Sequence, residues 1–152
     1  MKIGFVVKDL SPSQLSYNIT TKLNAELEQS CTDDYCVFIQ EPSSKMKPNN
    51  FSIINSTEMW SFDGILIATD IPTAKQISKT VGPSKKYFYV WDLYWSRPEW
   101  RDYESSILAF TDPTVKLLAR SEDHAKAISN YCNRDVCGIV DDFNIQQIRK
   151  LA

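Results

Sequence analysis

Glycine is scarce in this sequence. Its four glycines, Gly4, Gly64, Gly82 and Gly138, are never closer to one another than eighteen residues. A dinucleotide-binding fingerprint needs glycines one residue apart, so that the backbone can approach a pyrophosphate. A P-loop needs a glycine-rich nest that ends in Lys-Ser or Lys-Thr. The sequence therefore lacks both nucleotide-binding loops, and we expect no cofactor.

Histidine is nearly absent as well, since His124 is the one histidine of the sequence. A nucleophile activated by histidine, as in Ser/His or Cys/His enzymes, would have to use it. Ser121 stands one helical turn before His124, but a helix cap with a surface neighbour is the simpler interpretation of this pair.

The four cysteines fall into two pairs with equal spacing, Cys31/Cys36 and Cys132/Cys137. Zinc sites more often use tighter spacings with glycine nearby. We therefore expect no metal. The cysteines are interpreted as free, partly buried thiols, with a disulfide as the alternative.

The sequence also lacks long basic stretches and long apolar runs. The net charge is −2 and there is no long basic stretch, which argues against a nucleic-acid partner. The apolar runs are strand-sized, so we expect no membrane contact through a spanning segment. The first run, Ile3–Val7, turns polar at Lys8 and Asp9, too soon for a secretory leader. We expect a cytoplasmic protein.

Short apolar runs alternate with amphipathic stretches along the whole chain. Strand-like runs occur near 2–7, 35–40, 64–69, 86–91, 115–120 and 136–140, and 51–54 is a shorter candidate strand. The connections are long enough for crossovers, and this alternation is typical of a parallel sheet with helices on both faces. The sequence predicts an α/β fold, with residues 1–152 as a single Rossmann-like domain of about six strands.

Several helix boundaries are marked by the residues that favour them. Ser11 followed by Pro12 is typical of an N-cap and a first helical residue. Apolar residues at every fourth position between 15 and 27 then predict one buried helix face. A later helix over about 73–81 is expected to end at Gly82. Further N-caps are predicted at Ser96, Ser121 and Asn144.

The most unusual stretch of the chain is 86–103, which holds eight of the eighteen aromatic residues. Its strand runs into Trp91-Asp92-Leu93-Tyr94-Trp95, where the chain must turn back. Ligands of open α/β sheets collect at the carboxyl ends of the strands. Asp92 is the candidate catalytic residue, as a general base. The candidate residues for binding a partner or an acceptor are Trp91, Asp92, Tyr94, Trp95, Arg97, Asp9 and Asp70.

Two interpretations of these aromatic residues stay open. Exposed clusters of tryptophan and tyrosine usually mark an interaction site, with those rings as anchors. Alternatively, the rings cap the core beneath a long loop, because large apolar side chains gain free energy when they are buried.

The stretch 115–144, VKLLARSEDHAKAISNYCNRDVCGIVDDFN, resembles the end of the N-terminal domain of GT-B glycosyltransferases. In that family a strand ends in a serine that caps a helix, and the next strand leads into an Asn-Gly-Val-Asp-like turn that ends in an aromatic. Here Arg120-Ser121 and the run 139–143 stand in those places. The family's Asn-Gly is missing, with Gly138 placed earlier, and its glycine-rich first loop is absent.

The resemblance implies an acceptor-side Rossmann-like domain. In the family a donor-binding domain follows, whereas this sequence has eight residues after Asn144. We therefore expect a domain that stands alone without its donor half, as in a compact phage genome. Its location would then be the host cytoplasm or the virion.

Three functional hypotheses are consistent with these features. The first is a non-catalytic, glycosyltransferase-like binding or structural module that acts through a partner protein, a second copy of itself or a glycan. The second is the acceptor-binding half of a split, two-chain glycosyltransferase. The third is a small α/β enzyme with Asp92 as general base. Whether the protein is an enzyme stays open at this point.

Overall fold

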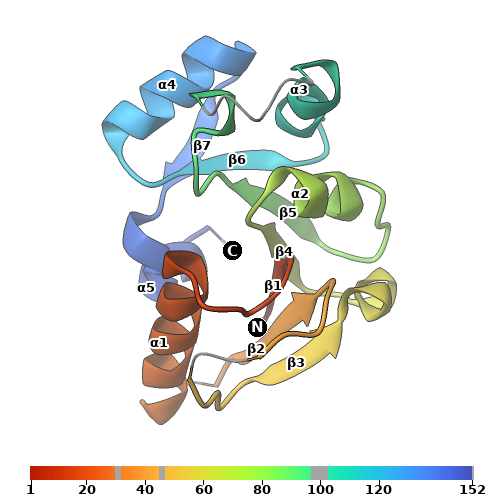
Figure 1. Cartoon of the computed structure of the whole chain (residues 1–152), viewed down its shortest axis with the longest axis vertical. Helices are drawn as coiled ribbons and strands as arrows, with labels where there is room; N and C mark the ends of the chain where they lie inside the picture. The colour runs from red at the N-terminus through yellow and green to blue at the C-terminus, as the bar shows by residue number, and fades with distance from the viewer. Residues whose placement is uncertain (30–31, 45–46, 97–102, 152) are drawn as a thin grey trace.

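The computed structural model describes residues 1–29, 32–44, 47–96 and 103–151. Within these residues, seven strands form one parallel sheet in the order β3-β2-β1-β4-β5-β6-β7 (Figure 1). The strands are β1 (Lys2–Val7), β2 (Asp34–Ile39), β3 (Ser52–Asn55), β4 (Ile65–Ala68), β5 (Lys85–Tyr89), β6 (Lys116–Ala119) and β7 (Val136–Ile139). The α-helices are α1 (Gln14–Glu28), α2 (Ile71–Ser78), α3 (Tyr103–Thr111), α4 (Glu122–Cys132) and α5 (Ile145–Arg149). Short 3-10 helices are η1 (Ser56–Ser61), η2 (Tyr94–Ser96) and η3 (Asp141–Phe143).

The predicted α/β fold is confirmed, because helices flank an all-parallel sheet in a Rossmann-like order. The six predicted strands lie near their expected positions. The short candidate run at 51–54 supplies a seventh strand, β3, which pairs with β2 at one margin of the sheet. None of the described helices has both the length and the apolar character that crossing a bilayer requires.

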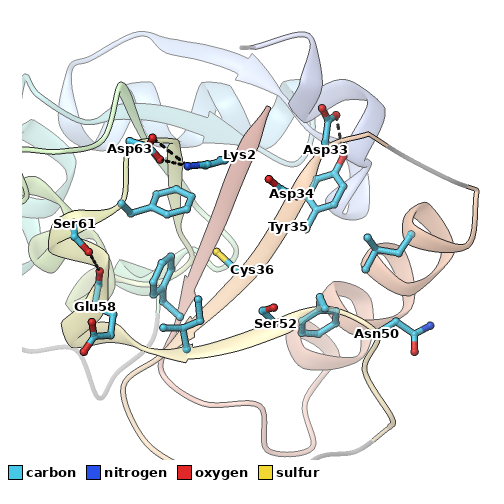
Figure 2. Close-up of a pocket in the computed structure, with 15 residues that line it drawn as sticks. Lys2, Asp33, Asp34, Tyr35, Cys36, Asn50, Ser52, Glu58, Ser61 and Asp63 are labelled. Atoms are coloured by element: carbon cyan, nitrogen blue, oxygen red, sulfur yellow. Dashed lines mark hydrogen bonds and ion pairs between the residues drawn. The ribbon is translucent and has the colours of Figure 1, made fainter.

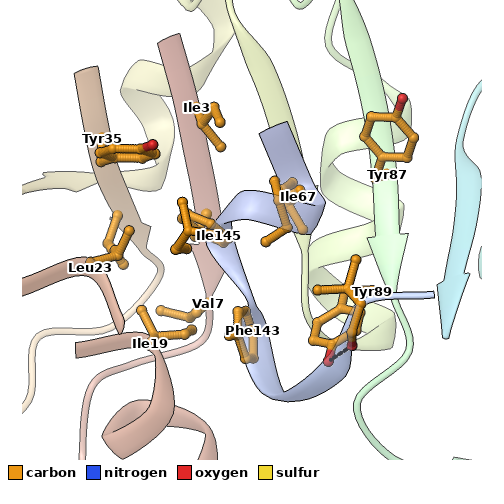
Figure 3. Packing of buried hydrophobic residues seen from close by; sticks show 14 of the residues in the cluster. Ile3, Val7, Ile19, Leu23, Tyr35, Ile67, Tyr87, Tyr89, Phe143 and Ile145 are labelled. Atoms are coloured by element: carbon orange, nitrogen blue, oxygen red, sulfur yellow. Dashed lines mark hydrogen bonds between the residues drawn. The ribbon is translucent and has the colours of Figure 1, made fainter. Parts of the chain in front are cut away.

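The two faces of the sheet are covered by different helices. Phe5 and Val7 of β1 belong to the core beneath α1 and α5, whereas Val6 belongs to the core beneath α2, α3 and α4. Figure 3 shows Ile19 and Leu23 of α1 lying against the strands from the first side. Each fully buried side chain of this kind stabilises the fold by roughly 1.5–3 kcal/mol.

Two crossovers contain no α-helix among their described residues. The connection between β2 and β3 runs beside α1, where Asn24 Nδ2 donates to the carbonyl of Pro48 at 2.9 Å. The return from β3 to β4 contains only η1. η1 and the residues after it pack against part of the face of β2 and β3 opposite α1, where Phe62 meets Phe38.

The first helix begins two residues later than the sequence predicts. Ser13 is the N-cap, since its Oγ accepts from the Ser16 N–H at 3.1 Å. Ser11 as N-cap is wrong: its N–H donates to Asp9 Oδ1 at 2.8 Å, and its hydroxyl donates to the same oxygen. This local turn of Asp9 competes with helix formation and delays it. The caps predicted at Ser121 and Asn144 are confirmed.

The second helix ends earlier than predicted, at Ser78 rather than near 81. Thr80 closes its end, where its N–H and hydroxyl donate to the Ile77 carbonyl at 3.1 and 2.7 Å. The prediction that Gly82 ends this helix in a left-handed conformation is wrong, because no glycine among the described residues has a positive φ. Val81 is 90% exposed as a result.

An ion-pair network holds α5 against α1 and β2. Arg149 donates from Nε to Asp33 Oδ2 at 2.8 Å and from Nη1 to Glu26 Oε1 at 3.1 Å. Both carboxylates are buried, and each has a second partner: the amino terminus of Met1 pairs with Asp33 at 3.0 Å, and Gln146 Nε2 donates to Glu26 at 2.9 Å. The network fixes α5, and thereby the η3 turn that precedes it.

Candidate functional site

The sheet has a topological switch point between β1 and β4. From β1 the chain crosses to β2 on one side, and from β4 it crosses to β5 on the other. Such a point opens a crevice at the carboxyl ends of the strands, and ligands of open α/β sheets bind there. Asp9 and Asp70 follow β1 and β4, and the Asp9 carboxylate lies near enough to add to the rise that burial causes in the pKa of Asp70.

Asp9 and Asp70 both stabilise the turns in which they stand. Asp9 accepts from Ser11, as described above. Asp70 is the N-cap of α2, where its Oδ1 accepts from the N–H of Thr73 at 2.8 Å and from its hydroxyl at 2.6 Å. Burial raises the pKa of the Asp70 carboxyl, and the hydrogen bonds from Thr73 and the charge of Lys8 act against this rise. These two carboxylates therefore hold the turns that follow β1 and β4 at the carboxyl edge of the sheet.

The aromatic turn after β5 is mostly part of the core. Trp91 and Tyr94 are buried, so of the two interpretations left open, the core interpretation holds for both. Trp91 packs on Phe143 in the core beneath α1 and α5, whereas Tyr94 lies on the opposite face, where its Oη donates to the Thr69 carbonyl at 3.0 Å. Trp95 is half-buried and stacks on Tyr131 of α4, with ring centroids 4.0 Å apart. Arg97 lies outside the described residues.

Arg120, at the end of β6, is held between an aromatic ring and a carboxylate. Its Cζ lies 3.9 Å from the ring centroid of Trp91, and its Nη2 donates to Asp142 Oδ1 at 2.8 Å. The guanidinium therefore covers one face of the indole, and that face is not available for stacking with a sugar. A cation–π contact of this kind contributes roughly 0.5–2 kcal/mol.

The backbone at Asp142 is strained. Asp142 and Phe143 have φ values of 39° and 58°, in the left-handed region that non-glycine residues rarely adopt. Phe143 is fully buried, with its ring centroid 5.2 Å from that of Trp91, and this packing holds the turn in place. Strained residues that their surroundings enforce are concentrated at functional sites. The strain here aims Asp142 at Arg120.

A cavity of about 320 Å³ lies beside this ion pair. Its lining residues are Arg120, Ser121, His124, Asp141 and Asp142. His124 Nδ1 accepts from the N–H of Arg120 at 3.2 Å, so in the neutral imidazole the proton is on Nε2. Burial lowers the pKa of His124, the Arg120 charge lowers it further, and the Asp92 carboxylate acts in the opposite direction. Asp92 itself is not among the residues that line the cavity.

The sequence singled out the carboxyl edge of the sheet but not this cavity. Asp92 was the catalytic candidate and Trp91 a binding candidate, whereas Arg120, His124 and Asp142 were not among the predicted site residues. Arg120 and Asp142 follow the ends of β6 and β7, which was a signal for these two, whereas His124 lies in the first turn of α4. The pairing of Arg120 with Trp91, across two neighbouring strands, was not visible in the sequence.

Among the described residues, neither the cysteines nor potential metal ligands form a candidate site. Cys36 and Cys132 are buried free thiols and Cys137 is an exposed one, while Cys31 lies outside the described residues. Burial raises the pKa of Cys36 to about 11, so its thiolate is scarce at neutral pH. In the described part of the chain, no three His, Cys, Asp or Glu side chains converge as metal ligands do.

Comparison with known proteins adds no further information. No family model matches the chain, and neither curated proteins nor solved structures give a match.

Proposed function

We propose that the chain is a non-catalytic, glycosyltransferase-like binding module and that it binds a glycan at the carboxyl edge of its sheet. The observation that carries this proposal is the Arg120–Asp142 pair, anchored on Trp91 beside a cavity. The resemblance of 115–144 to an acceptor-side domain agrees with a ligand of this class.

The chemistry of the cavity suits a neutral, polyhydroxylated ligand. Each sugar hydroxyl is both a donor and an acceptor. The guanidinium of Arg120 and the Nε2–H of His124 can donate, and the carboxylates of Asp141 and Asp142 can accept. Asp142 already compensates the charge of Arg120, and Asp141 adds a further negative charge. A phosphate or nucleotide would therefore be repelled more than an uncharged sugar.

The residues at the switch point support binding rather than catalysis. Asp9 and Asp70 act as local acceptors, and Asp70 also begins α2. Their carboxylates hold loops in place, which is the role of residues that preorganise a binding surface.

A second candidate function is the acceptor-binding half of a two-chain glycosyltransferase. The observation in its favour is the electrostatic interaction between Asp92 and His124 at this edge. Glycosyl transfer needs a base that takes the proton of the acceptor hydroxyl, and a carboxylate or an imidazole can do this. A pull-down from the native source separates the two: the half-enzyme should recover a partner chain that binds UDP- or GDP-sugars, whereas a binding module should not. Either candidate, as an isolated chain, should bind these donors no better than about millimolar, roughly −4 kcal/mol. Micromolar donor binding by the isolated chain would contradict both.

The direct experiment is a panel of immobilised oligosaccharides probed with the wild-type chain and two variants. Arg120→Gln and Asp142→Asn each remove one charge from the Arg120–Asp142 pair, which we call the clamp, and asparagine tolerates the left-handed backbone. Each variant is expected to weaken the retained interaction about tenfold or more, because charged hydrogen bonds contribute roughly 1.5–3 kcal/mol.

The matched controls are Lys126→Gln and Asp123→Asn, which remove the same charges from an exposed pair on α4. These should bind like the wild type. Retention of no oligosaccharide, or equal losses in the controls and the clamp variants, would contradict the proposal.

A further inference from the structure

A second cavity lies at the opposite, amino-terminal edge of the sheet. It has a volume of about 670 Å³ and opens where β1, β2 and β3 begin. Figure 2 shows Glu58, Ser61 and Asp63 on one side of it and Asp34 on the other, with Cys36 between them. The cavity exists because η1, rather than an α-helix, returns the chain from β3 to β4. We call it the amino-edge groove.

The floor of the amino-edge groove is apolar. Phe38 and Cys36 of β2 are buried there, and Ile54 of β3 and Phe62 are half-buried. Phe38 and Phe62 meet edge to face, with ring centroids 5.3 Å apart. This surface would gain roughly 25 cal/mol for each Å² of apolar area that a ligand covers.

The rim of the groove is acidic. Asp34, Glu58 and Asp63 are exposed around it, and Lys2 is the one cation among its lining residues. Lys2 is paired with Asp63, since its Nζ lies 2.8 Å from Oδ1. The rim therefore presents an excess of negative charge, which attracts cations and repels anions.

The amino-edge groove also borders β3, an edge strand of the sheet. Within the described residues, β3 pairs with β2 alone. Extended peptides bind proteins by adding to such an edge, where backbone hydrogen bonds supply affinity and side-chain pockets supply specificity.

We propose that the amino-edge groove is a docking site for an extended, basic segment of a partner protein that carries apolar side chains. The segment lies along β3, places an apolar side chain over Ile54 and Phe62, and directs arginine or lysine toward Asp34 and Glu58. This site is independent of the glycan site, because the two occupy opposite edges of the sheet.

The test uses fluorescence anisotropy with three short labelled peptides of equal length. One alternates arginine with leucine, the second replaces arginine by glutamate, and the third replaces leucine by serine. The first is expected to bind the wild-type chain about tenfold or more tightly than either of the others. Equal binding of the arginine–serine peptide would mean a surface for any polycation and would overturn the proposal.

Variants then locate the binding. Asp34→Lys with Glu58→Lys should weaken the arginine–leucine peptide about tenfold, whereas Glu104→Lys with Asp135→Lys changes the net charge equally at distant exposed positions and should not. Ile54→Ala truncates an apolar side chain of the groove floor and should weaken peptide binding. Leu108→Ala, which truncates an exposed apolar residue of α3, is its control and should not. Melting temperatures of all variants are measured, so that a loss of fold is distinguished from a loss of binding. Unchanged affinity in Asp34→Lys with Glu58→Lys would refute the site.

Discussion

Replacing Trp91 by alanine distinguishes a core ring from an exposed contact ring. Trp91 is 6% exposed, and its ring contacts Tyr89, Phe143 and the guanidinium of Arg120. By contrast, Trp60 of η1 is 49% exposed. Trp60→Ala therefore provides a matched control for the loss of a tryptophan.

The expected destabilisation can be worked from the burial. An aromatic side chain of this size buries roughly 150–250 Å², which corresponds to about 4–6 kcal/mol of transfer free energy. Measured Trp→Ala changes in cores cost roughly 3–5 kcal/mol. For a chain of this length each kcal/mol lowers the melting temperature by about 2–4 °C. A loss of about 4 kcal/mol thus predicts a fall of about 8–16 °C.

Circular dichroism during urea and thermal unfolding measures this change without relying on tryptophan fluorescence. Trp91→Ala should lose about 3–5 kcal/mol of unfolding free energy, and Trp60→Ala about 1 kcal/mol or less. If the two variants were equally stable, Trp91 would not be part of the core, and the clamp built on it would lose its anchor.

Three further predictions concern the titration of His124, the space around two glycines and the helix cap at Asp70. The lowered pKa of His124 means that the folded state favours the neutral imidazole. Unfolding free energy should therefore fall as the pH drops below about 6.5, the unfolded pKa, and through the lower folded pKa. This part of the pH dependence should be missing in His124→Gln. Gly64→Ala should destabilise by roughly 1–3 kcal/mol, because its Cβ would lie 2.4 Å from the Lys2 carbonyl oxygen. Gly138→Ala should cost less, since its Cβ would meet side chains rather than backbone, those of Leu151 at 3.0 Å and Leu118 at 3.4 Å. Asp70→Ala should cost about 1 kcal/mol through loss of the α2 cap, measured by urea unfolding.

The layered fold was predictable because local signals and global topology agree. Buried parallel strands appear as continuous apolar runs, and the first helix shows its face through apolar residues at every fourth position. Ser121 and Asn144 begin helices as predicted because their side chains act on residues three positions ahead.

The errors arose where residues distant in the sequence decide the outcome. Tyr94 is buried because its hydroxyl reaches the carbonyl of Thr69, twenty-five residues earlier. Arg120 meets Trp91 because β5 and β6 are neighbours in the sheet. The end of α2 is closed by Thr80, although Gly82 was the stronger local signal. Pattern reasoning locates strand ends, but it does not determine which side chains meet across them.

The most direct test of glycan binding at the carboxyl edge uses the single histidine of the sequence. His124 lines the cavity, so its imidazole Cε1 proton gives one NMR resonance that reports on the site. Maltotetraose, cellotetraose and chitotetraose are titrated into the wild-type chain and into Arg120→Gln at constant pH. The expected result is a saturable shift of this resonance with at least one oligosaccharide, lost or weakened about tenfold in the variant. If no oligosaccharide moves the resonance at millimolar concentration, or if the variant responds like the wild type, the carboxyl edge is not a glycan-binding site.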